Sequence, residues 1–373
     1  MTIYFGTFIL SYICCKSGER LSNRGKKRAA WCMLCAAVLF PAILAGIRDY
    51  TIGTDIATYG HWLFIGAKQA SNPLKFAFSN KSIDFLYSIL VYSTAHLFSS
   101  EHGLYFFTGL LIYGFTMAGI YRYRKIISIS IAWICFLFLF YGDTLNAMRQ
   151  CIAMSILLFA FSCFQSGDKR SFYILFVMAF LFHSTAVIVV VFVVVYRLLE
   201  KSNSLKMRAW ILVGTMAVML GYAKIVDLAV RLGMLNEKFL KYGMQTGAGF
   251  SLNPVIIRLP YLIFIMLFYS VYTGNGENKI EKPFADYIIM MILFEMLTAE
   301  MRAINPTLYR VSLYFGMYRY IGMGRVVKSL KSNNRIIVTW VIWILLVATW
   351  IYQNVVQGNN QIYPYTSELI GLQ

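Results

Sequence analysis

The sequence predicts an all-α, polytopic integral membrane protein with about ten transmembrane helices and two partial or re-entrant membrane segments. Hydrophobic residues make up 59% of the 373 residues and charged residues only 13%, whereas about a quarter of the residues of a soluble protein are charged. The apolar residues also fall in repeated runs that approach the roughly 20 residues needed to cross a bilayer. We therefore interpret residues 1–373 as a single transmembrane domain.

The basic residues predict which loops face the cytoplasm. The net charge is +18, and the Lys and Arg residues lie in short clusters between apolar runs, as in cytoplasmic loops beside anionic lipid. This pattern excludes nucleic acid as a partner. The predicted cytoplasmic loops are residues 16–28, 122–125, 197–208 and 324–335. Both termini then lie outside, with exterior loops at residues 48–81 and 231–253.

Ten apolar runs are interpreted as crossings, and they show no internal repeat. They are residues 2–15, 29–47, 103–121, 126–141, 147–164, 209–230, 254–273, 284–299, 307–323 and 336–353. The first run has neither the basic n-region nor the small-residue cleavage site of a signal peptide. All seven cysteines lie within or beside apolar runs. Cys32 and Cys35 have the spacing of a metal knuckle, but no second pair or His cluster accompanies them, so we interpret these two as packing residues of a span.

Two further segments are predicted to enter the membrane without crossing it. In residues 82–98 a polar residue recurs at every fourth position from Asp84 to His96, which gives one polar helix face. We interpret His96 as a hydrogen-bonded structural residue. Residues 172–196 are apolar except at His183, Ser184 and Thr185, which predicts a re-entrant hairpin with His183 at its tip. For His183 a structural and a functional role both stay open.

Charged residues beside the runs indicate candidate binding sites. Arg48, Asp49 and Asp55 surround Gly53, and a charged cluster at the end of a span is expected at the interface or in a wet cavity, although an ordinary polar loop is equally compatible. Arg149 and Gln150 share one helix face with a small residue. That face either lines an aqueous cavity or anchors the helix at the interface.

Arginine rather than lysine dominates near membrane depth. Arg258, Arg302, Arg310 and Arg319 belong to this group, and a planar guanidinium suits phosphate oxygens. An exterior cavity lined by arginine implies an anionic ligand. Arg310 and Tyr314 lie on one helix face, for which aromatic packing with a snorkelling arginine is the alternative.

Four segments resemble motifs of the EpsG-type, Wzy-like polysaccharide polymerases of bacterial envelopes. Gly46 to Asp55 with Tyr59 resembles the family's Arg, Gly-Thr-Asp and Tyr pattern, although Ile56 stands where the family often has an aromatic residue. The other three segments resemble its Arg-Gln-x-x-Ala, Phe-His-x-Ser/Thr-Ala and Arg-x-x-x-Tyr-Phe elements. They are residues 148–153, 182–186 and 310–315.

The resemblance implies a glycosyltransferase on the outer face of the bacterial inner membrane. Its donor and its acceptor would be oligosaccharide repeat units on undecaprenyl pyrophosphate, its surroundings membrane lipids, and a chain-length regulator a further partner. The product is an O-antigen, a capsule or an exopolysaccharide. No cofactor is expected, and no metal, because the exterior carboxylates do not cluster at ligand spacing. A lipid-linked oligosaccharide flippase and a membrane O-acyltransferase are the alternatives.

The mechanism needs charge stabilisation on the departing pyrophosphate and removal of a proton from the attacking hydroxyl. We assign the first role to Arg149 and Arg310 with help from Arg48. Asp55 is the first choice of base and His183 the second. The further residues expected to bind substrate are Gly53, Thr54, Tyr59, Gln150, Arg302 and Tyr314.

Overall fold

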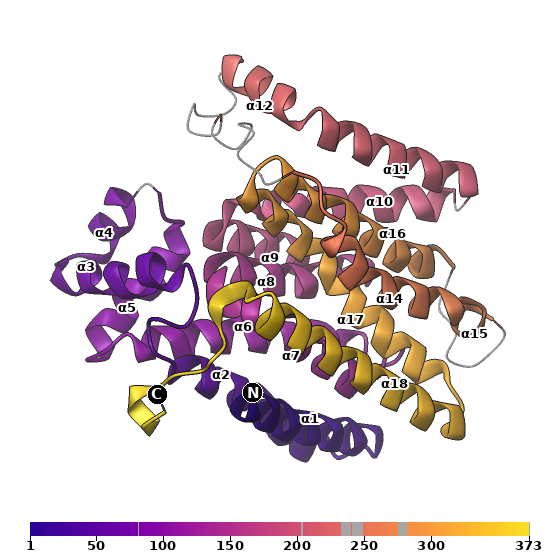
Figure 1. Cartoon of the computed structure of the whole chain (residues 1–373), viewed down its shortest axis with the longest axis horizontal. Coiled ribbons are helices and arrows are strands. Elements are labelled where there is room, and N and C mark those ends of the chain that lie inside the picture. Colours follow the sequence, from indigo (N-terminus) through magenta and orange to yellow (C-terminus); the bar gives the residue numbers. More distant parts are fainter. Residues whose placement is uncertain (81, 203, 233–239, 241–248, 275–281, 373) are drawn as a thin grey trace. The chain divides into compact units, whose positions relative to one another are not determined.

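The computed structural model describes the whole chain except residues 81, 203, 233–239, 241–248, 275–281 and 373 (Figure 1). The described residues are helices and their connections, without a β-strand beyond one isolated bridge. They fall into two compact units. The first unit comprises Met1–Val189 with Lys331–Gln373, and the second comprises Val190–Leu330. The prediction of a single transmembrane domain stays a prediction.

The first unit contains the helices from both ends of the chain. They are α1 (Thr2–Asn23), α2 (Lys27–Gly46), the π-helix η1 (Ala57–Trp62), α3 (Leu63–Gln69), α4 (Pro73–Ser79), α5 (Phe85–Leu97), α6 (His102–Arg122), α7 (Ile129–Asn146), α8 (Met148–Gln165), α9 (Lys169–Phe182), η2 (Ser184–Ile188), α18 (Ser332–Ile351), η6 (Tyr352–Val356), η7 (Asn359–Gln361) and η8 (Glu368–Ile370). In space α1 packs on α2, α2 on α6, α6 on α8, and α8 on α9.

Helix α7 forms the core of the first unit. It is apolar on all sides, and 94% of its residues are buried, as expected for a helix without a polar face. Its N-terminus is capped from another helix, because the carboxylate of Glu19 in α1 accepts from the backbone N–H groups of Ile129 at 2.9 Å and Ser130 at 3.1 Å. Such capping satisfies amides that have no partner within their own helix.

The segment 16–28 is largely helical rather than an open loop, and its cytoplasmic placement stays a prediction. Helix α1 continues to Asn23 and α2 begins at Lys27. The physical reason is that Lys, Arg and Glu are good helix formers, and the polar turns of α1 find partners such as the α7 N-terminus. Basic composition indicated which residues are polar but not where the helix ends.

The second unit is built around α16 and α17. Its helices are α10 (Val189–Lys201), α11 (Leu205–Leu220), α12 (Tyr222–Arg231), α14 (Asn253–Leu267), α15 (Tyr269–Thr273), α16 (Lys282–Ala299), η4 (Glu300–Ala303), η5 (Pro306–Arg310) and α17 (Val311–Ser329). Helix α16 packs against α14 and α17. Almost every residue of α17 is buried, its Arg319 and Arg325 included.

The all-α class is confirmed, but ten crossings are not. Among the described residues, five helices are long and apolar enough to span a membrane: α2, α6, α7, α8 and the segment Ser332–Val356. A sixth span results if α11 and α12 count together, although they meet at an angle of 65°. The junction is Gly221, a poor helix former. The run at 254–273 is likewise divided, into α14 and α15.

The two segments predicted to enter the membrane without crossing it are residues 82–98 and 172–196. Helix α5 has 13 residues, a length of about 20 Å that is too short for a bilayer core of about 30 Å. The run at 172–196 is interrupted where expected, since α9 ends at Phe182 and His183 has an extended backbone. A hairpin of α9 and α10 stays a prediction. Most of the predicted exterior loop at 231–253 lies outside the described residues.

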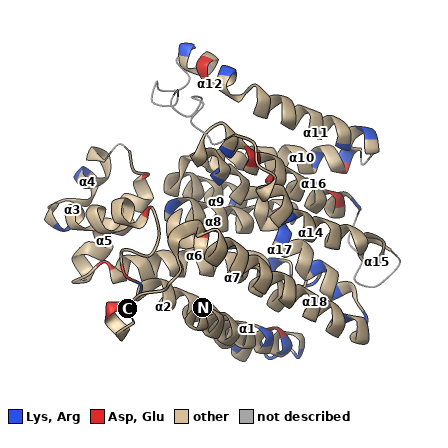
Figure 2. Cartoon of the chain, viewed as in Figure 1, with Lys and Arg blue, Asp and Glu red and all other residues tan. Residues whose placement is uncertain are grey.

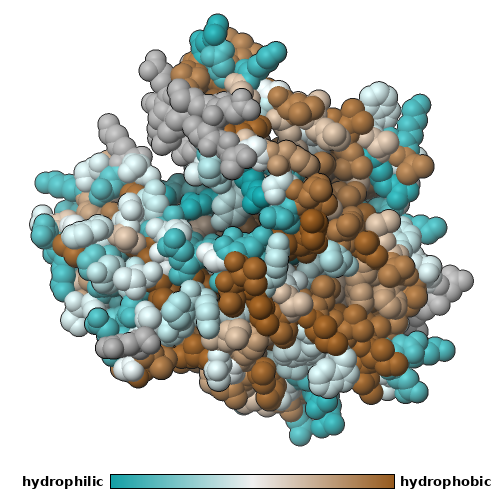
Figure 3. Space-filling model, in the orientation of Figure 1, coloured by the Kyte–Doolittle hydropathy of each residue, from teal (hydrophilic) through white to brown (hydrophobic). Residues whose placement is uncertain are grey.

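Surface chemistry agrees with a membrane protein. Charged residues gather mainly at helix ends and in connections, and the helix bodies are largely uncharged (Figure 2). The surface over α18 is mainly hydrophobic (Figure 3), and Ile336, Trp340 and Ile344 are exposed there. These residues are four apart and therefore share one face of α18. Such a face suits contact with lipid tails.

Candidate functional site

The carboxylate of Asp84 joins three segments of the first unit. Asp84 precedes α5, and its Oδ2 accepts a hydrogen bond from Arg149 Nη1 at 2.9 Å and lies 3.0 Å from His183 Nδ1. Its Oδ1 accepts from the backbone N–H of Ser184 at 3.1 Å. Because a carboxylate only accepts, the proton between the two side chains is on His183 Nδ1, and a neutral ring then keeps the lone pair of Nε2.

Arg149 is held from a second side by an aromatic ring. Its guanidinium carbon lies 4.2 Å from the ring centroid of Tyr59, in a cation–π contact. Tyr59 belongs to η1, and its carbonyl oxygen accepts from the Tyr87 hydroxyl at 3.0 Å. We call Tyr59, Asp84, Arg149 and His183 the Asp84 cluster.

The Asp84 cluster is partly accessible. The exposed fractions are 15% for the Asp84 side chain, 14% for Arg149 and 21% for His183. Burial alone would raise the pKa of Asp84. The interactions with His183 and Arg149 and the hydrogen bond from the Ser184 amide outweigh it and hold this pKa below its ordinary value. The carboxylate is therefore ionised at neutral pH and ties the arginine to the histidine.

The Gly-Thr-Asp segment docks on the end of α7. Asn146, the last residue of α7, accepts through Oδ1 from the Thr54 hydroxyl at 2.9 Å and also from the Thr54 backbone N–H. Gly53 has a φ of +114°, and a Cβ there would lie 2.9 Å from the same Oδ1. Both the backbone angle and the close approach require glycine. The Gly-Thr-Asp segment is thereby held against Asn146, which lies two residues before the Arg-Gln-x-x-Ala segment at 148–153.

The C-terminal segment after α18 also holds this loop. The backbone N–H of Gly53 donates to the Gln361 carbonyl at 3.2 Å, and the backbone N–H of Glu368 donates to Asp49 Oδ1 at 2.8 Å. Sequence reasoning missed this contribution. A short irregular segment carries no periodicity that would indicate its partner, so no signal in the sequence could have found it.

Arg48 is buried and bonded to the protein. Its guanidinium donates to the carbonyls of Ala45 at 3.1 Å and Leu145 at 3.2 Å, and it lies 4.9 Å from the ring centroid of Tyr105. Backbone oxygens and an aromatic face thus hold the guanidinium inside the protein, which favours a structural role. Its predicted contact with substrate stays a prediction.

The other first-unit candidates lie near the Asp84 cluster in the chain. Asp55 is half-buried, and its backbone carbonyl accepts from the Tyr59 N–H at 3.0 Å. Gln150 is buried in the first turn of α8, next to Arg149. The structure thus brings Tyr59, Arg149 and His183 together, with Asp55 one turn before Tyr59.

The remaining candidates belong to the second unit. Arg302 is in η4, Arg310 ends η5, and both are half-buried. Tyr314 is buried in the first turns of α17. The predicted face of Arg310 and Tyr314 therefore lies largely within the protein.

A second carboxylate, Glu295 in α16, joins two of the arginines that the sequence indicated. Glu295 Oε1 accepts from Arg258 Nε and from Arg319 Nη2, each at 2.8 Å. Arg319 also lies 5.2 Å from the ring centroid of Tyr261. The exposed fractions are 1% for Glu295, 11% for Arg258 and 4% for Arg319. We call these three residues the Glu295 cluster.

The family comparison agrees with the motifs. A family model described as the EpsG family matches residues 31–367. The chain belongs to the EpsG family. This is the family of Wzy-like polysaccharide polymerases, and the resemblance inferred from the motifs is confirmed. No curated protein and no solved structure matches the chain.

For this EpsG-family chain, sequence reasoning missed two carboxylates. Asp84 entered only as part of a polar helix face, and Glu295 was not considered. A usable signal existed for Glu295, which is an acidic residue within the apolar run of α16. Ionisable groups at membrane depth are expected to be paired and often functional. The EpsG family and the apolar helices together indicate a membrane protein of polysaccharide synthesis.

Proposed function

We propose that this protein is a glycosyltransferase that polymerises undecaprenyl-pyrophosphate-linked repeat units on the outer face of the bacterial cytoplasmic membrane. EpsG-family membership supports a polysaccharide polymerase. The predicted exterior placement of the Arg48 to Tyr59 segment supports the outer face. Both termini are proposed to lie outside.

One observation carries the proposal. The Asp84 cluster unites Tyr59 of the first family-like motif, Arg149 of the second and His183 of the third. The three come from separate parts of the chain and meet around one carboxylate. A packing role for each motif separately gives no reason for this meeting, whereas a shared reaction centre does.

Arg149 is proposed to bind the departing pyrophosphate. Within the described residues, both hydrogen bonds of its side chain come from Nη1, to Asp84 and to the Ser82 carbonyl. Nη2 and Nε then stay available for phosphate oxygens. A preorganised donor aimed at developing negative charge stabilises the transition state without reorganisation, and Asp84 and Tyr59 supply that preorganisation.

His183 is proposed to accept the proton of the attacking hydroxyl. Asp84 holds its Nδ1–H, so Nε2 presents a lone pair. The acceptor hydroxyl oxygen forms a bond with the anomeric carbon of the donor sugar, and the bond from that carbon to the pyrophosphate oxygen breaks. The hydroxyl proton passes to Nε2, and undecaprenyl pyrophosphate leaves. Asp55 is the alternative base.

The other predicted residues keep supporting roles in the proposal. Arg310 is assigned to the pyrophosphate by its motif, and Arg302 and Tyr314 to substrate binding in the second unit. Thr54 and Gly53 shape the motif loop, and Gln150 adjoins Arg149. The partners are the lipid-linked donor and acceptor and a chain-length regulator.

A glycan ladder tests the proposal. Surface glycan is compared between a deletion strain and the same strain carrying wild type, Arg149→Ala or, as a control, Arg24→Ala, which removes an exposed arginine. A ladder that collapses to one repeat unit in the deletion and stays collapsed only with Arg149→Ala supports the polymerase. An unchanged ladder in the deletion contradicts it.

The same strains separate the alternatives. Loss of a flippase removes surface glycan altogether, because no repeat unit reaches the outer face. Loss of an O-acyltransferase leaves chain length normal and removes acyl groups. Either pattern would replace the polymerase proposal.

A further inference from the structure

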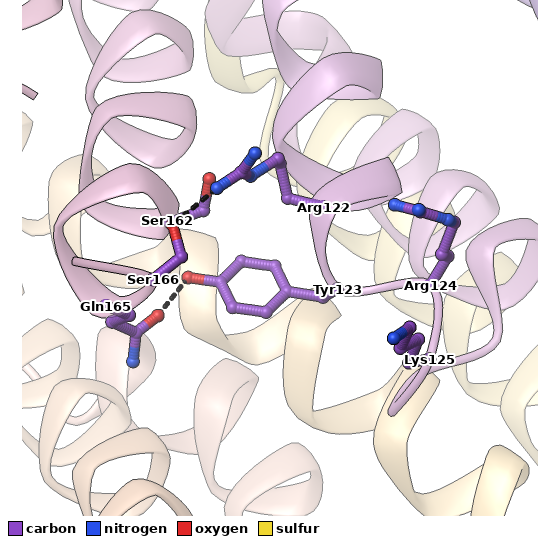
Figure 4. A pocket seen from close by; sticks show the side chains of 7 residues that line it. All are labelled: Arg122, Tyr123, Arg124, Lys125, Ser162, Gln165 and Ser166. Atoms are coloured by element: carbon purple, nitrogen blue, oxygen red, sulfur yellow. Dashed lines mark hydrogen bonds between the residues drawn. The ribbon is translucent and has the colours of Figure 1, made fainter. Parts of the chain in front are cut away.

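A basic pocket lies at the C-terminal ends of α6 and α8, whereas Arg149 of the Asp84 cluster lies in the first turn of α8. Its volume is about 370 Å³. The lining residues are Arg122, Tyr123, Arg124, Lys125, Ser162, Gln165 and Ser166 (Figure 4). All seven belong to the first unit. We call this cavity the basic pocket.

The chemistry of the basic pocket suits an anion. Three of its seven lining residues are cations, and none is acidic. The other four are polar, and the hydroxyls of Ser162, Ser166 and Tyr123 donate hydrogen bonds within the protein. A phosphodiester anion accepts hydrogen bonds only, so the guanidinium and ammonium donors of the pocket complement it.

Hydrogen bonds hold the walls of the basic pocket in place. Arg122 Nη2 donates to the Ser166 hydroxyl at 2.5 Å, and the Tyr123 hydroxyl donates to Gln165 Oε1 at 2.5 Å. Both bonds join the end of α6 to the end of α8, as Figure 4 shows. The pocket is therefore a built cavity between two helices rather than a row of independent surface side chains.

Arg124 is oriented by an aromatic ring. Its guanidinium lies 4.5 Å from the ring centroid of Tyr121 and donates to the Tyr121 carbonyl at 3.1 Å. Lys125 is exposed. The nearby carboxylate of Asp168 caps α9 through the Ser171 amide at 3.1 Å and is not a lining residue.

The basic pocket lies where two spans leave the apolar region. Helices α6 and α8 are both candidate spans, and they end at Arg122 and Gln165. Beside them the rings of Trp31 and Tyr121 are 4.8 Å apart, and Trp31 is half exposed. Trp and Tyr are enriched at the level of lipid headgroups. An anion at this depth is most abundantly the phosphate of a lipid.

We propose that the basic pocket binds the phosphate of an anionic phospholipid headgroup. This proposal does not depend on the proposed function, because it concerns a separate cavity. Cations also stabilise helix C-termini through the helix dipole. Arg122 lies in the last turn of α6 and can serve that purpose, but Arg124 and Lys125 follow the helix and also line the cavity.

The test is a binding titration of the purified full-length protein in neutral detergent. The probes are short-chain phosphatidylglycerol, short-chain phosphatidylcholine and inorganic phosphate, and bound lipid is counted by native mass spectrometry. The variant Arg124→Gln with Lys125→Gln removes two pocket cations. Its matched control, Lys26→Gln with Lys27→Gln, removes two exposed cations at the start of α2.

The expected result is preferential binding of phosphatidylglycerol, weakened by about fivefold for each cation removed from the pocket and unchanged in the control. Equal losses in the variant and the control would reduce the effect to general surface charge and overturn the proposal. Inorganic phosphate binding as tightly as phosphatidylglycerol would overturn the lipid assignment in favour of a free-phosphate site. Absence of binding by any probe would remove the site.

Discussion

The Asp84 cluster and the Glu295 cluster have similar arrangements of charged side chains but differ in exposure to solvent. In each, one carboxylate joins two nitrogen-bearing side chains, and one arginine lies over a tyrosine ring. The side chains of Asp84, Arg149 and His183 are 14% to 21% exposed, whereas those of the Glu295 cluster are 1% to 11% exposed. Similar local chemistry therefore serves two purposes.

The difference in access indicates which cluster can act on a substrate. A buried charge that loses its partner destabilises the protein, so the arginines of a buried pair do not exchange their carboxylate for a ligand. A partly exposed arginine can exchange water for phosphate oxygens. We accordingly interpret the Glu295 cluster as structural and the Asp84 cluster as the proposed reaction centre.

The largest effect is expected from Glu295→Ala. It leaves Arg258 and Arg319 without their shared carboxylate, at a cost of about 3–5 kcal/mol. Thermal unfolding of the purified protein in detergent measures this. The control is Glu200→Ala, which removes an exposed i,i+3 partner of Arg197 and should cost under about 1 kcal/mol. Equal effects of the two changes would remove the distinction between buried and exposed pairs.

Exchange of arginine for lysine should affect activity in the Asp84 cluster and folding in the Glu295 cluster. Arg149→Lys loses the planar fork that suits phosphate, and we expect polymerisation to fall by about 100-fold, the loss typical of one transition-state donor. The amount of folded protein should not change. Arg319→Lys should instead lower the amount of folded protein. Immunoblots of membranes and glycan ladders measure both, and a full ladder with Arg149→Lys would exclude the fork from the site.

A smaller effect is expected from Asp84→Asn. The neutral amide keeps the size of the side chain but weakens its bonds to Arg149 and His183. Hydrogen bonds to charged groups contribute roughly 1.5–3 kcal/mol, which corresponds to a tenfold to hundredfold loss of rate if the bonds position reacting groups. A purely structural Asp84 would change thermal stability and leave the rate per folded molecule as in wild type.

The smallest effect is a dependence of stability on acid pH. The pKa of Asp84 in the folded protein lies below its ordinary value of about 3.9. The ionised carboxylate therefore stabilises the fold above that value, and the contribution is lost as the pH falls through the lowered pKa. The difference in unfolding temperature between wild type and Asp84→Asn should therefore shrink as the pH falls below about 4. A difference in unfolding temperature that grows as the pH falls would contradict a lowered pKa of Asp84.

The apolar runs of the sequence predicted the positions of several helices, but they did not predict where those helices end. The runs predicted α6 and α8 to within a residue or two, because a continuous apolar stretch must be buried or face lipid. They missed the extension of α1 to Asn23, the bend at Gly221 and the division of α14 from α15. Those boundaries depend on capping and on local backbone propensity, which composition does not record.

The motifs indicated three members of the Asp84 cluster but not the residue that joins them. Tyr59, Arg149 and His183 were candidates by pattern, whereas the pairing of Asp84 with His183 links positions 99 residues apart. Periodicity reports which residues share a helix face and says nothing of contacts between helices. The hydrogen bond from Gly53 to Gln361 has the same character.

The most direct test of the Asp84 cluster is chain growth by the purified protein from a synthetic undecaprenyl-pyrophosphate repeat unit. Product length and released undecaprenyl pyrophosphate are measured together for wild type, Arg149→Ala, His183→Gln and the control Arg24→Ala. We expect elongation by wild type and the control and strong loss of elongation in both cluster variants, with all four proteins folded. Elongation by folded Arg149→Ala at the wild-type rate would contradict it.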